Sequence, residues 1–261
     1  MKDHTPRLTP IQKVAGGIYL KRDDLYCRAG IRGGKVRACW HLATTARPAG
    51  PALGLITASS RRSPQAQIVA RLAANLGIPA RCHMPRGKQT EEMQDMVAHG
   101  GELVQHKAGY NNVIIARAKE DHEERPGWRY IPFGMEHPEA IKCTRGQVRK
   151  IPKKVKRIVV CIGSGMSAAG ILHGLRDLDL NIPVLGVRVG ANPQKRLDTF
   201  GPVWWNQSME IVTSPHAYED AVQMSIGGVV LDPHYESKCV EFVRRYDLFW
   251  VVGIRATAAT A

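Results

Sequence analysis

Short apolar runs alternate with segments of helical periodicity through the middle of the chain. The apolar runs predict strands, and segments whose apolar residues recur at every third or fourth position predict helices. The predicted strands span residues 53–58, 80–84, 102–105 and 128–131, and the predicted helices span residues 64–76, 90–99 and 111–123. This alternation is typical of a parallel sheet that carries helices on both of its faces.

The alternation continues on both sides of this region. Further strands are predicted at 18–21, 157–162, 184–189, 211–212 and 248–254, and further helices at 36–45, 168–178, 217–224 and 236–246. We therefore expect an α/β fold with two parallel-sheet, three-layer domains. Residues 1–49 and 132–261 are expected to form the larger domain, and residues 50–131 a smaller domain inserted into it.

Local residue types mark several of the expected helix ends. Thr90 is expected to cap the helix that follows it, because its hydroxyl can accept a hydrogen bond from a first-turn amide. Gly77 and Gly100 are expected to end the helices before them, because glycine readily adopts the left-handed conformation found there.

The charge balance adds a possible partner. The formal net charge is +14, from 37 lysines and arginines against 23 aspartates and glutamates. Such an excess favours an anionic partner, either nucleic acid or a phosphorylated ligand. The basic residues are spread along the chain except for one dense cluster at 149–157, which fits a solvated loop as well as a nucleic-acid contact.

Other classes of protein are disfavoured by composition. The six cysteines are scattered without a Cys-x-x-Cys pair, so we expect reduced thiols, no disulfide framework and no metal site. No apolar run approaches the roughly 20 residues that span a bilayer, and the first residues lack the apolar stretch of a secretory signal. A cytoplasmic protein without a membrane partner is expected.

Lys35 is a candidate nucleophile. It stands in Gly33-Gly-Lys-Val-Arg37 at the expected start of a helix, where the glycines let a ligand approach the backbone closely. Its amine could form a Schiff base if burial or a neighbouring cation such as Arg37 lowers its pKa. The alternative is an ordinary surface lysine after a glycine turn.

The stretch Gly163-Ser-Gly-Met-Ser-Ala-Ala-Gly170 is a candidate anion site. It follows a predicted strand and opens a predicted helix, so its backbone amides and the helix N-terminus favour a phosphate. A dinucleotide is disfavoured, because the next strand ends in Arg188 where a ribose would need an acidic residue. A tight turn without a ligand is the alternative.

Two further stretches carry candidate polar groups. Ser59, Ser60 and Ser63 lie between a predicted strand and a predicted helix, where they could cap the helix or bind a carboxylate. Tyr235 could handle protons, and Glu236 could accept a hydrogen bond from a cationic heterocycle. An acidic residue in a first helical turn is equally explained by the helix dipole.

Taken in order, these stretches resemble one family. Together with Leu76-Gly-Ile-Pro79 and Leu231-Asp-Pro-His-Tyr-Glu-Ser-Lys238, they resemble pyridoxal-phosphate enzymes of the tryptophan synthase β-like fold, also called fold type II. Within these, the chain is most similar to the branch of 1-aminocyclopropane-1-carboxylate deaminase and D-cysteine desulfhydrase. Arg22-Asp-Asp24 ahead of the lysine fits that branch. The resemblance covers the chain from about Thr9 to Ile254.

The resemblance implies a role for each candidate residue. Lys35 would hold pyridoxal phosphate as a Schiff base, and Glu236 would face the pyridine nitrogen. Tyr235 would lie beside the substrate, and Ser60 would sit at the substrate carboxylate and share in proton transfer. The cofactor phosphate would be held by Gly163, Ser164, Gly165, Met166, Ser167 and Ala168, and further substrate contacts would come from Ser59, Arg61 and Gln65.

The chain also departs from the family pattern. Arg61 and Arg62 stand where an asparagine usually contacts the ring hydroxyl of the cofactor, and Gly34 stands where an asparagine usually precedes the lysine. Met166 replaces the third glycine of the phosphate loop. The Gly-Tyr-Gly substrate loop of the deaminases is missing, with Tyr218 as a loose substitute. The usual C-terminal Thr-Gly-Gly is replaced by Val252-Gly-Ile-Arg255.

The expected function is therefore a pyridoxal-phosphate enzyme that removes the α-proton of an amino acid and catalyses elimination, deamination or replacement. One alternative is a related enzyme that modifies an amino-acid group attached to nucleic acid, as in phage DNA base hypermodification, which the net charge would suit. Another alternative is a cofactor-binding protein that has lost turnover. The resemblance implies a homodimer.

Overall fold

The computed structural model describes residues 7–45 and 50–253 of the chain. These residues belong to two compact units. Unit 1 comprises the N-terminal segment up to Tyr26 and the segment from Glu136 onward, and unit 2 comprises Cys27–Met135. Residues 27–45, which carry Lys35, and residues 132–135 lie in unit 2, although the sequence pattern assigns them to the larger domain. Every helix in the described ranges is too short or too polar to cross a membrane.

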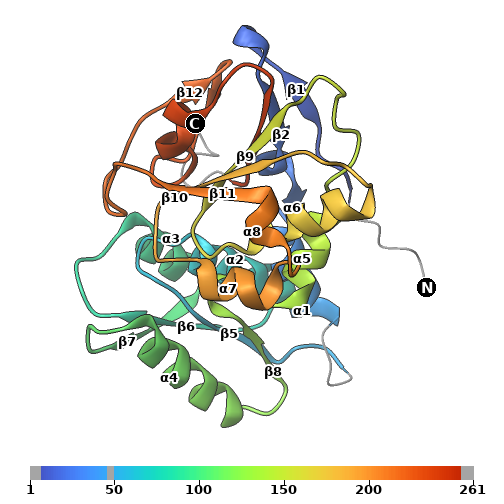
Figure 1. Ribbon diagram of the computed structural model, residues 1–261. Coiled ribbons are helices and arrows are strands. Elements are labelled where there is room, and N and C mark those ends of the chain that lie inside the picture. Colours follow the sequence, from blue (N-terminus) through green and yellow to red (C-terminus); the bar gives the residue numbers. More distant parts are fainter. Residues whose placement is uncertain (1–6, 46–49, 254–261) are drawn as a thin grey trace. The chain divides into compact units, whose positions relative to one another are not determined.

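Unit 1 is built on a six-stranded sheet with the strand order β1-β2-β14-β9-β10-β11 (Figure 1). All neighbouring strands run parallel except β1, which is antiparallel to β2. The central strands β9 and β14 are almost wholly apolar, because parallel strands in the middle of a sheet are covered on both faces. The strands are β1 (Ile11–Lys13), β2 (Tyr19–Arg22), β9 (Arg157–Ile162), β10 (Val184–Arg188), β11 (Met209–Thr213) and β14 (Asp247–Val251).

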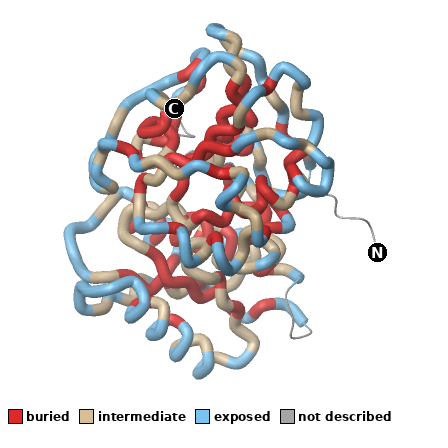
Figure 2. Tube along the Cα trace, in the orientation of Figure 1, coloured by how far each residue is buried: buried red, intermediate tan, exposed pale blue. Residues whose placement is uncertain are grey.

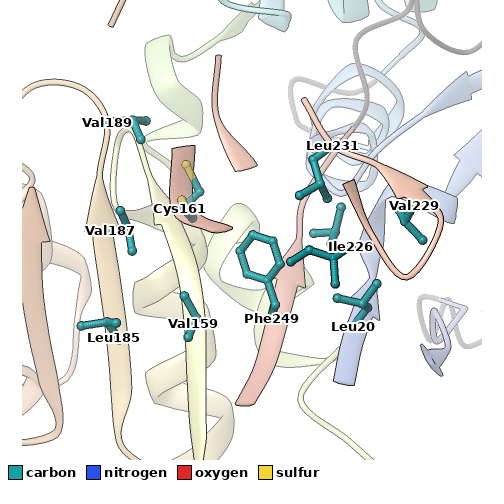
Figure 3. Packing of buried hydrophobic residues seen from close by; sticks show 12 residues of the cluster. Leu20, Val159, Cys161, Leu185, Val187, Val189, Ile226, Val229, Leu231 and Phe249 are labelled. Atoms are coloured by element: carbon teal, nitrogen blue, oxygen red, sulfur yellow. The ribbon is translucent and has the colours of Figure 1, made fainter. Parts of the chain in front are cut away.

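One face of this sheet carries the main apolar core of unit 1. Alternate residues of the central strands, among them Val159, Val187 and Phe249, pack there against residues of a small hairpin (Figure 3). The hairpin consists of β12 (Ser225–Ile226) and β13 (Val229–Val230). The remaining elements of unit 1 are α5 (Pro138–Arg145), α6 (Met166–Asp177), α7 (Gln194–Phe200), α8 (Trp205–Ser208) and the 3-10 helices η1 (Ala15–Gly17), η2 (Asp23–Leu25) and η4 (Glu236–Phe242).

Unit 2 is built on a four-stranded, wholly parallel sheet with the order β7-β6-β5-β8. Strand β5 is buried along its whole length (Figure 2). The strands are β5 (Gly54–Ala58), β6 (Ala80–Pro85), β7 (Gly101–His106) and β8 (Trp128–Ile131), and a hairpin of β3 (Cys27–Arg28) and β4 (Ile31–Arg32) precedes them. The helices are α1 (Lys35–Thr45), α2 (Gln65–Leu76), α3 (Glu91–Ala98) and α4 (Asn111–Glu123), with the 3-10 helix η3 (Phe133–Met135).

Helices cover both faces of the sheet in unit 2. On one face, Cys82 and Met84 of β6 pack with apolar residues of α2 and α3. On the other face, Ile56 and Ala58 of β5 pack with apolar residues of α4. This three-layer arrangement is the one that the alternation of strands and helices predicts.

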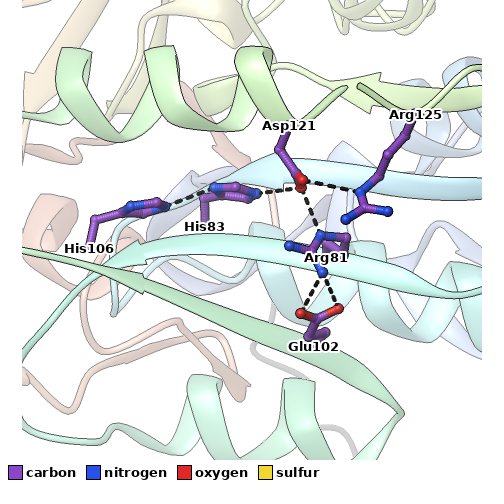
Figure 4. Close-up of polar contacts among 6 residues, drawn as sticks. All are labelled: Arg81, His83, Glu102, His106, Asp121 and Arg125. Carbon is purple, nitrogen blue, oxygen red and sulfur yellow. Dashed lines mark hydrogen bonds and ion pairs between the residues drawn. The ribbon is translucent and has the colours of Figure 1, made fainter. Parts of the chain in front are cut away.

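A polar network joins β6 and β7 of this sheet to α4 (Figure 4). Asp121 of α4 accepts hydrogen bonds from Arg81 at 2.7 Å, from His83 at 3.0 Å and from Arg125 at 3.1 Å. The bonds from Arg81 and His83 outweigh burial and lower the pKa of Asp121. Because the ionised carboxylate accepts from Nε2 of His83, Nδ1 of His83 is left to accept from Nε2 of His106, 2.9 Å away. Burial lowers the pKa of both histidines, which keeps this neutral pair intact.

Most of the predicted elements are confirmed. The helix predicted at 111–123 and the strands predicted at 128–131 and 157–162 match α4, β8 and β9 from end to end. Thr90 caps α3 by accepting a hydrogen bond from the Met93 amide, and Gly77 ends α2 in the left-handed conformation.

Two helix predictions near the C-terminus are wrong. Residues 217–224 contain no helix, because their backbone amides are bonded to other groups. The Ala217 amide donates to the Asp220 carboxylate, and the Val222 amide donates to the Pro233 carbonyl. The helix predicted at 236–246 is the shorter 3-10 helix η4. Within the strand predicted at 248–254, Ile254 lies outside the described residues.

Helix α5 was not predicted, although the sequence carries its signals. His137 caps it by accepting a hydrogen bond from the Glu139 amide, and Pro138 occupies its first turn. The charged loop character of the surrounding residues hid these signals. The helix matters because it packs closely on α6.

We predict that this close packing depends on Gly170 of α6. A Cβ atom there would lie 2.6 Å from Cβ of Thr144 and 3.0 Å from the Ile141 carbonyl oxygen, so Gly170→Val should lower the free energy of unfolding by about 1–3 kcal/mol. Urea unfolding measures this change. The matched control is Gly146→Ala, whose new methyl would meet only ordinary contacts and should change stability by less than about 0.5 kcal/mol. Equal stability of the two variants would contradict the prediction.

Candidate functional site

Lys35 is the first residue of α1 in unit 2, as the sequence predicts to within one residue. The chain reaches it from the β3–β4 hairpin through Gly33, whose φ of 114° is open to glycine and strained for other residues. The Val36 amide donates to the Gly33 carbonyl at 3.1 Å and begins the helix. Val36 and the following apolar residues are buried, so the half-buried lysine is set on a firmly packed helix start.

The serine segment lies where β5 ends and α2 begins, also in unit 2. Ser59 is 2% exposed, and its amide donates to the His83 carbonyl at 2.9 Å. Its hydroxyl donates to the carbonyl of Ser60 at 3.1 Å. At the start of α2, the hydroxyl of Ser63 accepts a hydrogen bond from the Gln65 amide at 3.3 Å.

Two of the expected substrate contacts have partners within unit 2. The guanidinium of Arg61 donates to the Lys88 carbonyl at 3.0 Å. Gln65 is fully buried, and its Nε2 donates to the Thr57 hydroxyl at 3.0 Å and to the Pro132 carbonyl at 2.7 Å. These bonds join β5 to the end of β8, while Oε1 of Gln65 is buried with no partner among the described residues.

The glycine loop of unit 1 joins β9 to α6. Gly165, with φ of 90°, precedes the first helical residue Met166, and no side chain caps the helix there. The first-turn amides therefore point out of the helix end with its partial positive charge. A Cβ at Gly163 would lie 3.2 Å from the Tyr235 ring, so this glycine lets the ring lie against the loop backbone.

The structure brings two tyrosines together beside this loop. The hydroxyls of Tyr218 and Tyr235 are 3.1 Å apart and their rings meet edge to face. Lys238, which the sequence reading did not select, fixes Tyr218 by donating to the carbonyls of Ala217 and Tyr218 at 2.6 and 3.1 Å. It is 1% exposed, and burial lowers its pKa. The only sequence signal for it is its position three residues after Tyr235.

Glu236 is a buried carboxyl group at the end of the same sheet. It is 3% exposed, and its Oε1 accepts from the Val252 amide at 3.0 Å. Burial, with a smaller contribution from the charge of Asp232, raises the pKa of Glu236 to about 8. A cation placed against it would reverse this shift, because an opposite charge favours the ionised form.

The residues of unit 1 therefore meet at one edge of its sheet. Gly163, Gly190 and Val252 follow the carboxyl ends of β9, β10 and β14, where parallel sheets bind their ligands. The edge offers uncapped amides for an anion and a buried carboxyl for a cation. These two features fit the phosphate and the pyridine nitrogen of pyridoxal phosphate. The described residues contain no cluster of side chains that could hold a metal ion.

The sequence matches a family described as pyridoxal-phosphate dependent enzyme over residues 4–231. It is 25% identical over 209 residues to the biosynthetic L-threonine dehydratase IlvA of Corynebacterium glutamicum, covering 77% of this chain and 46% of that protein. It is 30% identical over 183 residues to the L-threonine ammonia-lyase of Geobacter sulfurreducens, covering 70% of this chain and 44% of that protein. The chain thus spans less than half the length of these relatives.

The fold is also found in solved structures. An ACC deaminase homologue superposes with a TM-score of 0.75 and 22% identity, covering 98% of this chain and 92% of that one. Threonine deaminase isoform 2 of Solanum lycopersicum superposes with a TM-score of 0.64 and 17% identity, covering 97% and 86%. The expected α/β class and the resemblance to fold type II are confirmed.

We predict that Glu236 makes the stability of the cofactor-free protein depend on pH. Its carboxyl has a pKa of about 8 when folded and an ordinary value near 4.5 when unfolded, so between these values the folded state holds the extra proton. The unfavourable contribution of Glu236 to the free energy of unfolding therefore grows as the pH rises from about 4.5 to about 8, because ionising the buried carboxyl group costs free energy. Glu236→Gln should therefore gain stability over wild type at pH 8 and gain less at pH 5.

Denaturant unfolding at the two pH values measures the difference. The control is the exposed Glu241→Gln, which should give the same small difference at both values. A Glu236→Gln variant whose stability differs from wild type by a constant amount from pH 5 to pH 8 would contradict the prediction.

Proposed function

Because the chain belongs to the family of pyridoxal-phosphate-dependent enzymes, we propose that it acts on an amino acid by removing the α-proton, with elimination, deamination or replacement as the outcome. The printed names of the relatives, a threonine dehydratase and an ammonia-lyase, support elimination with loss of ammonia. The observation that carries the proposal is the pairing, at one sheet edge, of an uncapped glycine loop with a buried carboxyl group.

The residues at this edge have distinct proposed roles. The amides from Gly163 to Ala168 bind the cofactor phosphate through hydrogen bonds and the helix dipole. Glu236 accepts a hydrogen bond from the protonated pyridine nitrogen and is itself ionised by that charge. When bound, pyridoxal phosphate supplies an electron sink for the substrate α-carbon.

The resemblance to the family also suggests roles for the side chains that handle protons and bind substrate. We propose that Lys35 binds the cofactor aldehyde and then moves the proton at the substrate α-carbon, since an unprotonated amine can act as nucleophile and as base. Tyr235, whose hydroxyl lies 3.1 Å from that of Tyr218, orients the substrate. Ser60 binds the substrate carboxylate, with Ser59 and Gln65 behind it. Arg61 contributes positive charge, with its guanidinium on the Lys88 carbonyl.

We predict that Lys35→Ala abolishes the visible absorbance of the cofactor-loaded protein and lowers turnover by about 10²–10⁴. The measurement is an absorbance spectrum after addition of pyridoxal phosphate, followed by a screen of amino acids with product identification. The control is Lys107→Ala, an exposed lysine of the same unit. A wild-type protein that takes up no cofactor would refute the proposal, and a loaded protein whose spectrum no amino acid changes would favour the alternative that turnover is lost.

A second candidate function, the binding of nucleic acid, is supported by one exposed surface of unit 1. Seven basic residues, Arg149, Lys150, Lys153, Lys154, Lys156, Arg244 and Arg245, are exposed on the loop before β9 and the turn before β14. The Lys156 amide donates to the Tyr246 carbonyl, and the centre of the Tyr246 ring lies 5.5 Å from Nζ of Lys156 and 4.7 Å from Cζ of Arg245. This basic loop surface lies at the amino ends of β9 and β14, the edge opposite Gly163. A basic surface interleaved with an aromatic ring suits a nucleic-acid backbone.

We predict that this surface binds a DNA duplex and that affinity falls linearly on a log–log scale as salt is raised. Lys153→Glu with Lys154→Glu should weaken binding at least about 10-fold in fluorescence anisotropy. The control, Lys107→Glu with Lys119→Glu in unit 2, changes the net charge by the same amount. An equal loss in both double variants would show that only net charge matters. The homodimer implied by the resemblance and the cytoplasmic location expected from the composition remain predictions.

A further inference from the structure

Arg188 is the last residue of β10 and lies beside the glycine loop. Its Cα pairs with that of Ile162, the residue directly before Gly163. Because side chains alternate along a strand, Arg188 faces away from the core that holds Val187 and Val189. It therefore projects from the other face of the sheet, at the edge where α6 begins.

The guanidinium of Arg188 lacks an acidic partner in the described chain. Its Nε is buried and makes no hydrogen bond there. Three other part-buried arginines of unit 1 are paired, Arg22 with Asp24 at 2.7 Å, Arg157 with Asp247 at 2.6 Å and Arg196 with Glu136. A charged group that is buried without an opposite charge is unfavourable, so this position is suited to an anion that the chain itself does not supply.

The residues after Arg188 lie directly on the loop. The Val189 amide donates to the Ile162 carbonyl at 3.1 Å. A Cβ at Gly190 would lie 3.9 Å from Cα of Gly163, and one at Gly165 would lie 3.3 Å from Pro193. The arginine and the uncapped helix start are thus two sources of positive charge in one small region of unit 1.

We propose that Arg188 binds the phosphate group of the cofactor together with the amides of the loop. The inference rests on the proposed function and adds to it a residue that selects the phosphorylated cofactor. A guanidinium presents a planar set of donors that matches a phosphate, so its contribution is specific to that group and absent for an unphosphorylated analogue. The same residue explains why the sequence disfavours a dinucleotide at this loop, since a positive charge replaces the acid that a ribose requires.

The test compares pyridoxal phosphate with pyridoxal, which lacks the phosphate. Equilibrium dialysis of wild type and Arg188→Gln against each ligand gives two affinities for each protein. Arg188→Gln is expected to weaken the binding of pyridoxal phosphate by about 10- to 100-fold and to leave the binding of pyridoxal unchanged. Inorganic phosphate should compete with pyridoxal phosphate in wild type and compete more weakly in the variant.

Two further variants complete the design. Arg188→Lys keeps the charge and should restore part of the affinity for pyridoxal phosphate. This partial recovery would show that Arg188→Gln loses affinity through the missing charge and not through a disrupted fold. Arg176→Gln, an exposed arginine of α6, is the control and should bind both ligands as wild type does. Equal losses for both ligands, or no loss for either, in a folded Arg188→Gln protein would overturn the inference. A wild type that binds neither ligand would instead overturn the proposed function.

Discussion

The parallel pairing of β9 with β14 on one side and with β10 on the other is the constraint on which the candidate site of unit 1 depends. Parallel strands in register end at the same edge, so Gly163, Gly190 and Val252 follow three neighbouring strand ends. Each strand is held by main-chain bonds and by buried apolar side chains. The apolar core of the sheet therefore fixes the positions of the polar groups at its edge, although those groups lie almost wholly outside that core.

Burial gives these polar groups their chemistry. Glu236 is protonated near neutral pH because the surroundings exclude water, and it is ready to ionise when a cation arrives. Lys238 is buried too, but its amine is used by two carbonyls and serves to fix Tyr218. Of these two buried groups, Lys238 therefore holds a loop of the chain in place, and Glu236 is suited to a cationic ligand.

Unit 2 separates structural from chemical groups in the same way. His83 of β6 is bonded to Asp121 on one side and to His106 of β7 on the other, so the histidine pair stabilises the sheet. The guanidinium of Arg61 donates to the Lys88 carbonyl, and the substrate contact that the resemblance implies for it remains a prediction. Lys35, in contrast, owes its setting to the glycines before it and the buried helix behind it, both visible in the sequence.

The sequence by itself determined the fold class, most strands and helices, the helix start at Lys35 and the loop at Gly163. Period-two and period-3.6 patterns, glycines and caps are local, and local patterns are read directly from a chain. It did not determine that residues 217–224 lack a helix, because this depends in part on the bond from the Val222 amide to the Pro233 carbonyl. It also did not show that the amine of Lys238 is buried against the carbonyls of Ala217 and Tyr218, because these bonds join residues about twenty positions apart. It also did not show that Arg188 lies next to Ile162, since only the pairing of β10 with β9 brings those residues together. Long-range pairing is decided by the packing of the whole sheet, and so it was the tertiary structure that placed these groups.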